Sequence, residues 1–244
     1  MMHLDTFGRA GEPPLLLLHG GGVAGWMWEP MRAHLSSHAR VLVPDLPGHG
    51  RSASGNYTSH QETVDLLAHI LEDEGRPATV VGFSLGAQLA VLLAAVRPDL
   101  VESTVVISAQ TLPLRLTGPA LALLGATAGL AKNEKFARLQ ARELFVPESH
   151  LADYLQTSSS LSRETLLTSV EENLRFAPPA DWSTFPGSAL ILVGAAEKKL
   201  MKRSAAALHA ALPHSTLEVI DGCGHGIPLQ RPEWLANRIE EARA

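Results

Sequence analysis

The sequence contains a single cysteine, Cys223, so no disulfide can form within the chain. That usage is typical of proteins from reducing compartments. Long hydrophobic runs are also missing, because the longest uncharged run, Leu116–Ala131, contains Pro119 and three glycines and falls short of the roughly 20 apolar residues that cross a bilayer. The first residues lack the basic start and apolar core of a secretory signal. We therefore expect a cytoplasmic protein without membrane insertion.

An excess of positive charge is absent as well. The chain has 20 basic and 25 acidic residues, a formal net charge of −5, which argues against nucleic acid as a partner. Of the 244 residues, 45% are hydrophobic and 18% charged, enough to fill the core of one large domain. We therefore expect the partner to be a small-molecule substrate.

Short, continuous apolar runs alternate with segments of helical character. Continuous runs are typical of strands that are covered on both faces, and strand–helix alternation predicts an α/β protein with a mostly parallel central sheet flanked by helices. The predicted strands are Leu15–His19, Arg40–Asp45, Thr79–Ser84, Thr104–Ser108, Ala189–Gly194 and Thr216–Asp221. The predicted helices include Tyr57–Gly75, with Thr58 or Ser59 as the N-cap, Leu85–Arg97, Lys198–Leu212 and Pro228–Arg243.

This alternation stops between about Thr111 and Trp182. The stretch has no convincing strand, but Glu164–Phe176 carries apolar residues at helical spacing, and Pro147 followed by Glu148 is a good helix start. We expect residues 111–185 to form a helical cap inserted between two strands. Residues 1–110 and 186–244 would form the core of the same single domain.

The strongest chemical motif is GFSLG at residues 82–86, between a predicted strand and a predicted helix. A serine at such a sharp turn is exposed, and the helix N-terminus behind it offers backbone N–H groups to a developing oxyanion. Ser84 is therefore the candidate nucleophile.

A serine nucleophile needs a base, and the base needs a carboxylate to orient it. His225 is the best base, because it lies in a glycine-rich loop after the last strand and downstream of the serine. Glu197, just past the preceding strand, is the favoured acid, with Asp221 and Glu218 as alternatives. The strand that ends at Ser108 offers no carboxylate.

Two glycine-containing loops follow the first two predicted strands. The loop HGGG at residues 19–22 allows its amides to approach a ligand, so one of them and the amide of Leu85 could form an oxyanion hole. The segment DLPGHGRS at residues 45–52 is interpreted as a structural turn. No cofactor or metal is expected, since zinc-type ligand spacing and a G-x-G-x-x-G loop after a strand are both missing from the sequence.

Together, HGGG, DLPGHGRS, GFSLG and the GCGH of residues 222–225 occur in an order that resembles the α/β-hydrolase superfamily, most closely its small, cap-bearing serine esterases. The resemblance covers roughly residues 14–110 and 186–243. It implies Ser84 as nucleophile, His225 as base, the amides of Gly21 and Leu85 as the oxyanion hole and the insertion as a cap. The acid in this family is usually aspartate, whereas this chain has Glu197.

These residues predict a carboxylesterase that works through an acyl-enzyme. The nearly uncharged segment Leu112–Leu130 favours an apolar acyl or alcohol group if it lies over the serine. Candidate pocket residues are Trp26, Trp28, Leu112 and Leu114. The alternatives are hydrolysis of a lactone, thioester, amide or carbon–carbon bond by the same triad, a lyase, or a ligand-binding, receptor-like protein with vestigial catalysis.

Overall fold

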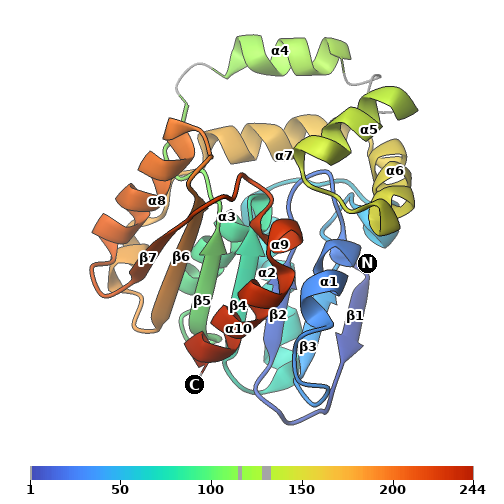
Figure 1. The fold of residues 1–244 in the computed structure, drawn as a ribbon. Helices are drawn as coiled ribbons and strands as arrows, with labels where there is room; N and C mark the ends of the chain where they lie inside the picture. The colour runs from blue at the N-terminus through green and yellow to red at the C-terminus, as the bar shows by residue number, and fades with distance from the viewer. Residues whose placement is uncertain (1, 115–116, 128–132, 244) are drawn as a thin grey trace.

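The computed structural model describes residues 2–114, 117–127 and 133–243, and its centre is a seven-stranded sheet with helices on both faces (Figure 1). The strands lie in the order β1-β3-β2-β4-β5-β6-β7, and all neighbours are parallel except β1, which is antiparallel to β3. The predicted fold class is confirmed. The strands are β1 (Leu4–Phe7), β2 (Leu15–Leu18), β3 (Val41–Pro44), β4 (Ala78–Phe83), β5 (Val101–Ile107), β6 (Ser188–Gly194) and β7 (Thr216–Ile220).

The two faces of the sheet bury separate hydrophobic clusters. In β2, Leu16 and Leu18 belong to one cluster and Leu15 and Leu17 to the other, as expected from the two-residue period of a strand. The first cluster is covered by α2 (His60–Glu74), α3 (Leu85–Val96) and α8 (Lys199–Ala211). The second is covered by η1 (Gly25–Trp28), α1 (Glu29–Arg32), α9 (Ile227–Gln230) and α10 (Pro232–Arg243).

All six predicted strands are present, whereas β1 was not predicted and the last helix differs from its prediction. The N-cap of α2 is Ser59, which was one of the two predicted caps. Its side chain accepts a hydrogen bond from the N–H of Glu62. The helix predicted over Pro228–Arg243 is instead two helices, α9 and α10. The break falls at Arg231 because Pro232 disfavours helical backbone at the residue before it.

The insertion between β5 and β6 is helical in its described part, which contains no strand. It comprises α4 (Gly118–Thr127), α5 (Glu134–Glu143), η4 (Glu148–His150), α6 (Leu151–Ser160), α7 (Arg163–Arg175) and η5 (Ala180–Thr184). Helices α4 to α7 lie across the carboxyl ends of the central strands (Figure 1). Within the predicted apolar segment Leu112–Leu130, residues 115–116 and 128–130 lie outside the described residues.

The η2 turn (Gly50–Ser52) follows β3 and belongs to the DLPGHGRS segment.

Among the helices that the structure describes, none combines the length and the apolar character that crossing a bilayer requires.

Candidate active site

Ser84 lies at the turn between β4 and α3 with a strained backbone, φ 53° and ψ −108°. The turn needs glycine on both sides. A Cβ on Gly82 would lie 2.2 Å from the carbonyl oxygen of Gly86, and one on Gly86 would lie 2.2 Å from that of Leu18. These close approaches explain the GxSxG spacing and direct the serine away from the sheet.

His225 connects Ser84 to Glu197. Its Nε2 lies 3.1 Å from Ser84 Oγ, and its Nδ1 lies 2.9 Å from Glu197 Oε2. Since a carboxylate accepts, the proton of the neutral imidazole sits on Nδ1, and Nε2 is left to accept from the serine hydroxyl. The three residues come from the ends of β4, β6 and β7, and the fold brings them into one chain of hydrogen bonds.

The carboxylate of Glu197 is almost completely enclosed, with 1% of its side chain exposed. Oε1 accepts two further hydrogen bonds, from the Ser108 hydroxyl at 2.6 Å and from the Gly194 N–H at 3.0 Å. Burial raises the pKa of this carboxyl, but the hydrogen bonds from His225, Ser108 and Gly194 outweigh it and hold the pKa below the usual value. The group is therefore an anion at neutral pH.

The two alternative acids lie elsewhere. Asp221 is exposed at the end of β7, and Glu218 forms an ion pair with Arg238. The sequence predicts Glu197 as the acid but gives no signal for Ser108, because the end of β5 carries a hydroxyl and no carboxylate.

Gly21 and Leu85 both line the cavity that contains Ser84. Leu85 is the first residue of α3, so its N–H has no intrahelical acceptor. The loop of Gly21 is held by His19, which is fully buried: its Nε2 accepts the Leu46 N–H at 2.9 Å, and its Nδ1 is 2.7 Å from the carbonyl oxygen of Gly20. The first bond requires Nε2 to be unprotonated, so Nδ1 is the donor of the second.

A cavity of about 560 Å³ opens between Ser84 and the helical insertion. Its walls are mostly apolar, and most of them come from α5, α6 and α7. The lining consists of Gly21, Gly22, Ser84, Leu85, Leu124, Phe136, Gln140, Glu143, Leu144, Tyr154, Ser158, Leu161, Leu166, Ser169, Val170 and Asn173. A space of this size is typical of sites for small organic ligands.

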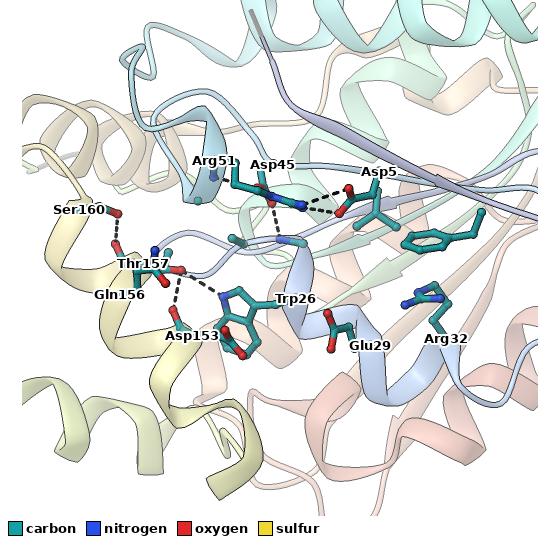
Figure 2. Close-up of a pocket in the computed structure, with 15 residues that line it drawn as sticks. Asp5, Trp26, Glu29, Arg32, Asp45, Arg51, Asp153, Gln156, Thr157 and Ser160 are labelled. Carbon is teal, nitrogen blue, oxygen red and sulfur yellow. Dashed lines mark hydrogen bonds and ion pairs between the residues drawn. The ribbon is translucent and has the colours of Figure 1, made fainter.

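The pocket residues expected from the sequence do not line this cavity. Trp28 is completely buried in the core. Trp26 lines a separate cavity of about 430 Å³, where its indole N–H donates to Thr157 Oγ1 at 3.1 Å (Figure 2). Its ring also stacks on His150. Both tryptophans lie in η1, whose packing against the sheet and α6 turns them away from the serine.

Leu112 and Leu114 follow β5 but do not line the cavity, and Leu114 is exposed. The backbone N–H of Leu112 donates to Ser204 Oγ on α8, and that of Leu114 donates to the carbonyl oxygen of Leu174 on α7. The apolar wall is instead supplied by residues such as Phe136 and Val170, which the sequence analysis did not single out.

The contacts of Asp45 agree with the interpretation of residues 45–52 as a structural turn. Its buried carboxylate accepts the N–H groups of Gly25 and Arg51 and the Nε of Arg51, while Arg51 also pairs with Asp5 (Figure 2). These contacts join η1, η2 and β1 rather than reaching Ser84, His225 or Glu197.

Comparisons with known proteins agree with this architecture. Residues 15–238 match the model of the alpha/beta hydrolase family. The chain is 30% identical to the pimeloyl-[acyl-carrier protein] methyl ester esterase of Aromatoleum aromaticum, over 94% of this chain and 98% of that protein.

Solved structures share the fold at lower identity. A bromoperoxidase from Bacillus anthracis superimposes with a TM-score of 0.85 at 20% identity, covering 99% of this chain and 95% of that one. The enol-lactonase of Burkholderia xenovorans gives 0.82 at 21% identity, covering 99% and 96%. The chain belongs to the alpha/beta hydrolase family and is a hydrolase.

Proposed function

We propose that the protein is a serine carboxylesterase with Ser84 as nucleophile, His225 as general base and Glu197 as the acid of the triad. The observation that carries this proposal is the continuous hydrogen-bond chain, 3.1 Å from Ser84 Oγ to His225 Nε2 and 2.9 Å from His225 Nδ1 to Glu197 Oε2, at the edge of a mostly apolar cavity. A hydroxyl paired with an oriented imidazole is the arrangement that acyl transfer requires.

In the first half-reaction, Ser84 Oγ attacks the ester carbonyl carbon while its proton passes to His225 Nε2. The carbonyl oxygen becomes an oxyanion, which the amides of Gly21 and Leu85 stabilise, and Glu197 stabilises the imidazolium. The alkoxide then leaves and takes the proton from His225. Water attacks the acyl-enzyme by the reverse route, yielding the free acid and restoring Ser84.

The apolar lining favours an ester with an apolar acyl chain. The relative named above acts on a methyl ester, and we extend that preference for a small alcohol group to this chain. Residues such as Phe136, Leu166 and Val170 would contact the acyl chain, while the alkoxy group would leave beside His225.

The experiment that tests this proposal measures hydrolysis of p-nitrophenyl esters of increasing acyl length by wild type and Ser84→Ala. We expect Ser84→Ala to lose about 10³-fold or more in kcat. An activity-based fluorophosphonate should label wild type and leave Ser84→Ala unlabelled. Ser103→Ala is a matched control, because Ser103 is a buried serine on β5 whose hydroxyl lies 2.9 Å from Thr79 Oγ1, at the opposite end of the sheet.

Wild-type turnover by Ser84→Ala would contradict the proposal. Labelling of Ser84 without hydrolysis of any ester would keep the nucleophile and favour one of the other reactions of the same triad, on a lactone, thioester, amide or carbon–carbon bond.

A further inference from the structure

Backbone strain in the described residues gathers around the triad. Among the residues that the structure describes, three other than glycine have positive φ: Ser84 at 53°, Ser108 at 56° and Phe145 at 59°. Ser84 is the candidate nucleophile, Ser108 contacts Glu197, and Phe145 packs beside Gly224 and Gly226, the neighbours of His225. Strained conformations of this kind persist where the surrounding structure holds them and cluster at functional sites.

We propose that Ser108 is a positioning residue of the active site, whose hydroxyl holds the Glu197 carboxylate in the orientation that His225 needs. This proposal rests on the proposed function, since it assigns a role toward the same triad. Ser108 acts through Glu197 and does not touch the substrate.

The buried hydroxyl of Ser108 donates a hydrogen bond to Glu197. Ser108 is 1% exposed, and its Oγ lies 2.6 Å from Glu197 Oε1, the range of a strong hydroxyl–carboxylate hydrogen bond. Its backbone N–H donates to the carbonyl oxygen of Leu192 at 2.9 Å, which fixes the residue at the edge between β5 and β6. The positive φ then directs the side chain toward the end of β6, where Glu197 lies.

The two carboxylate oxygens of Glu197 have separate partners. Oε1 accepts from Ser108 and from the Gly194 N–H, while Oε2 accepts from His225. A glutamate has one more rotatable bond than an aspartate, so its carboxylate has more freedom to turn. Two donors from different strands on Oε1 remove this freedom and leave Oε2 facing the imidazole.

A purely structural role would predict something different. In that case the hydroxyl would only satisfy a buried carboxylate, and its loss would lower stability without changing the protonation behaviour of the reaction. A positioning role predicts a change in kcat and in the acidic side of the pH–rate profile. Burial raises the pKa of Glu197. The hydrogen bond from His225 lowers that pKa most, and the hydrogen bond from Ser108 lowers it next.

The test compares wild type, Ser108→Ala, Ser108→Gly, Ser84→Ala and the control Ser103→Ala with p-nitrophenyl butyrate between about pH 5 and 9. Ser108→Ala and Ser108→Gly should both lower kcat about tenfold, the effect of one hydrogen bond to a charged group, with KM unchanged. The acidic limb of kcat/KM should move to higher pH, because a Glu197 carboxylate with one donor fewer keeps more negative charge facing His225 and stabilises the imidazolium, which cannot accept the Ser84 proton. Ser103→Ala should lower the melting temperature and leave kcat and the acidic limb as in wild type.

The glycine variant separates the hydroxyl from the backbone strain. Glycine adopts a φ of 56° without a steric penalty, so Ser108→Gly should melt at a higher temperature than Ser108→Ala while losing the same activity. It also keeps the test valid if the alanine variant does not fold.

Two outcomes overturn the proposal in distinguishable ways. If Ser84→Ala is inactive while both Ser108 variants keep the wild-type kcat and pH profile, Ser108 has no positioning role and the proposed function stands. If Ser84→Ala keeps wild-type turnover, the proposed function is wrong and the role of Ser108 is wrong with it.

Discussion

The carboxylate of Glu197 makes three hydrogen bonds in a space that excludes water, and this arrangement explains how a glutamate can act at this position. The longer side chain reaches His225 at 2.9 Å, while the Gly194 N–H and the Ser108 hydroxyl hold its other oxygen. The extra methylene is therefore matched by the positions of the donors around it.

The length of this side chain can be tested directly. Glu197→Asp withdraws the carboxylate by one methylene, so it cannot keep both sets of hydrogen bonds, and we expect kcat to fall about 10- to 100-fold with little change in KM. Glu197→Gln can present an amide N–H to Nδ1 and so favour the wrong tautomer of His225, for which we expect a loss of about 10³- to 10⁴-fold. Steady-state kinetics with p-nitrophenyl butyrate measures both.

An aspartate variant with the wild-type kcat would show that the reach of the side chain does not matter. A glutamine variant no worse than the aspartate variant would show that the negative charge does not matter. Thermal melting of both variants controls for loss of fold.

At the scale of elements, α7 connects the helical insertion to the helix that begins after Ser84. It lines the cavity through residues such as Val170 and Asn173, and it contacts α3 through Gln88, which is completely buried one turn after Ser84. Gln88 Nε2 donates to the carbonyl oxygens of Gln110 at 2.6 Å and Asn173 at 3.1 Å. Its Oε1 is 2.9 Å from His60 Nε2, which must then carry the proton.

Replacing Gln88 should loosen this connection. Gln88→Met keeps the approximate shape but leaves two part-buried carbonyl oxygens and the buried His60 N–H without their partner, so we expect the free energy of unfolding to fall by about 2 kcal/mol. KM should rise because α7 forms part of the cavity wall. Urea denaturation and ester kinetics measure the two effects.

Gln61→Met is the matched control, because Gln61 is exposed on α2 and bonds to Asp65 at the surface. If Gln88→Met is as stable as Gln61→Met and has an unchanged KM, the buried network does not hold α7 in place.

The elements also show what the sequence could and could not predict. Six strands were predictable because short, continuous apolar runs bounded by turn residues are typical of strands buried on both faces. The edge strand β1 was missed because its four residues, LDTF, are only partly buried and carry no apolar run. The cavity wall was missed because Phe136, Tyr154 and Val170 come from three different helices, and their meeting over Ser84 depends on tertiary packing.

The candidate site was also predictable from the sequence only in part. Ser84, His225 and Glu197 were predictable from motif, chain order and strand ends, because the ends of neighbouring parallel strands meet at one edge of a sheet. Ser108 was not predicted, although it also lies at a strand end, between the strands that precede the proposed nucleophile and the proposed acid. A search of those ends for hydroxyl donors as well as carboxylates would have found it.

At the scale of the whole molecule, three buried histidines determine the response to acid. His19, His49 and His60 are at most 4% exposed, and burial lowers the pKa of each. The effect is largest for His49, whose pKa falls to about 3 through burial and the nearby His19. In the folded protein His49 therefore remains neutral well below the pH at which an unfolded chain would protonate it, and His19 and His60 also take up protons at a lower pH than in an unfolded chain.

The sign of the effect follows from this difference. Below the unfolded pKa of about 6.5, these histidines bind protons more readily in the unfolded state than in the folded state. The free energy of unfolding therefore falls as the pH falls. His49 contributes about 1 kcal/mol per pH unit until the pH reaches its folded pKa of about 3, and His19 and His60 act in the same direction. Asp45 and Glu197 act in the same direction at lower pH, because hydrogen bonds outweigh burial and lower their pKa values below those of an unfolded chain.

We therefore expect the free energy of unfolding, measured by urea denaturation, to fall steeply between about pH 6.5 and 5. His49→Asn should reduce that slope by about 1 kcal/mol per pH unit, because the amide can keep the hydrogen bond to the carbonyl oxygen of Pro47 without binding a proton. His34→Asn removes an exposed histidine and should leave the slope unchanged. Equal slopes for His49→Asn and wild type would mean that His49 is protonated in the folded protein, and burial would then not control its charge.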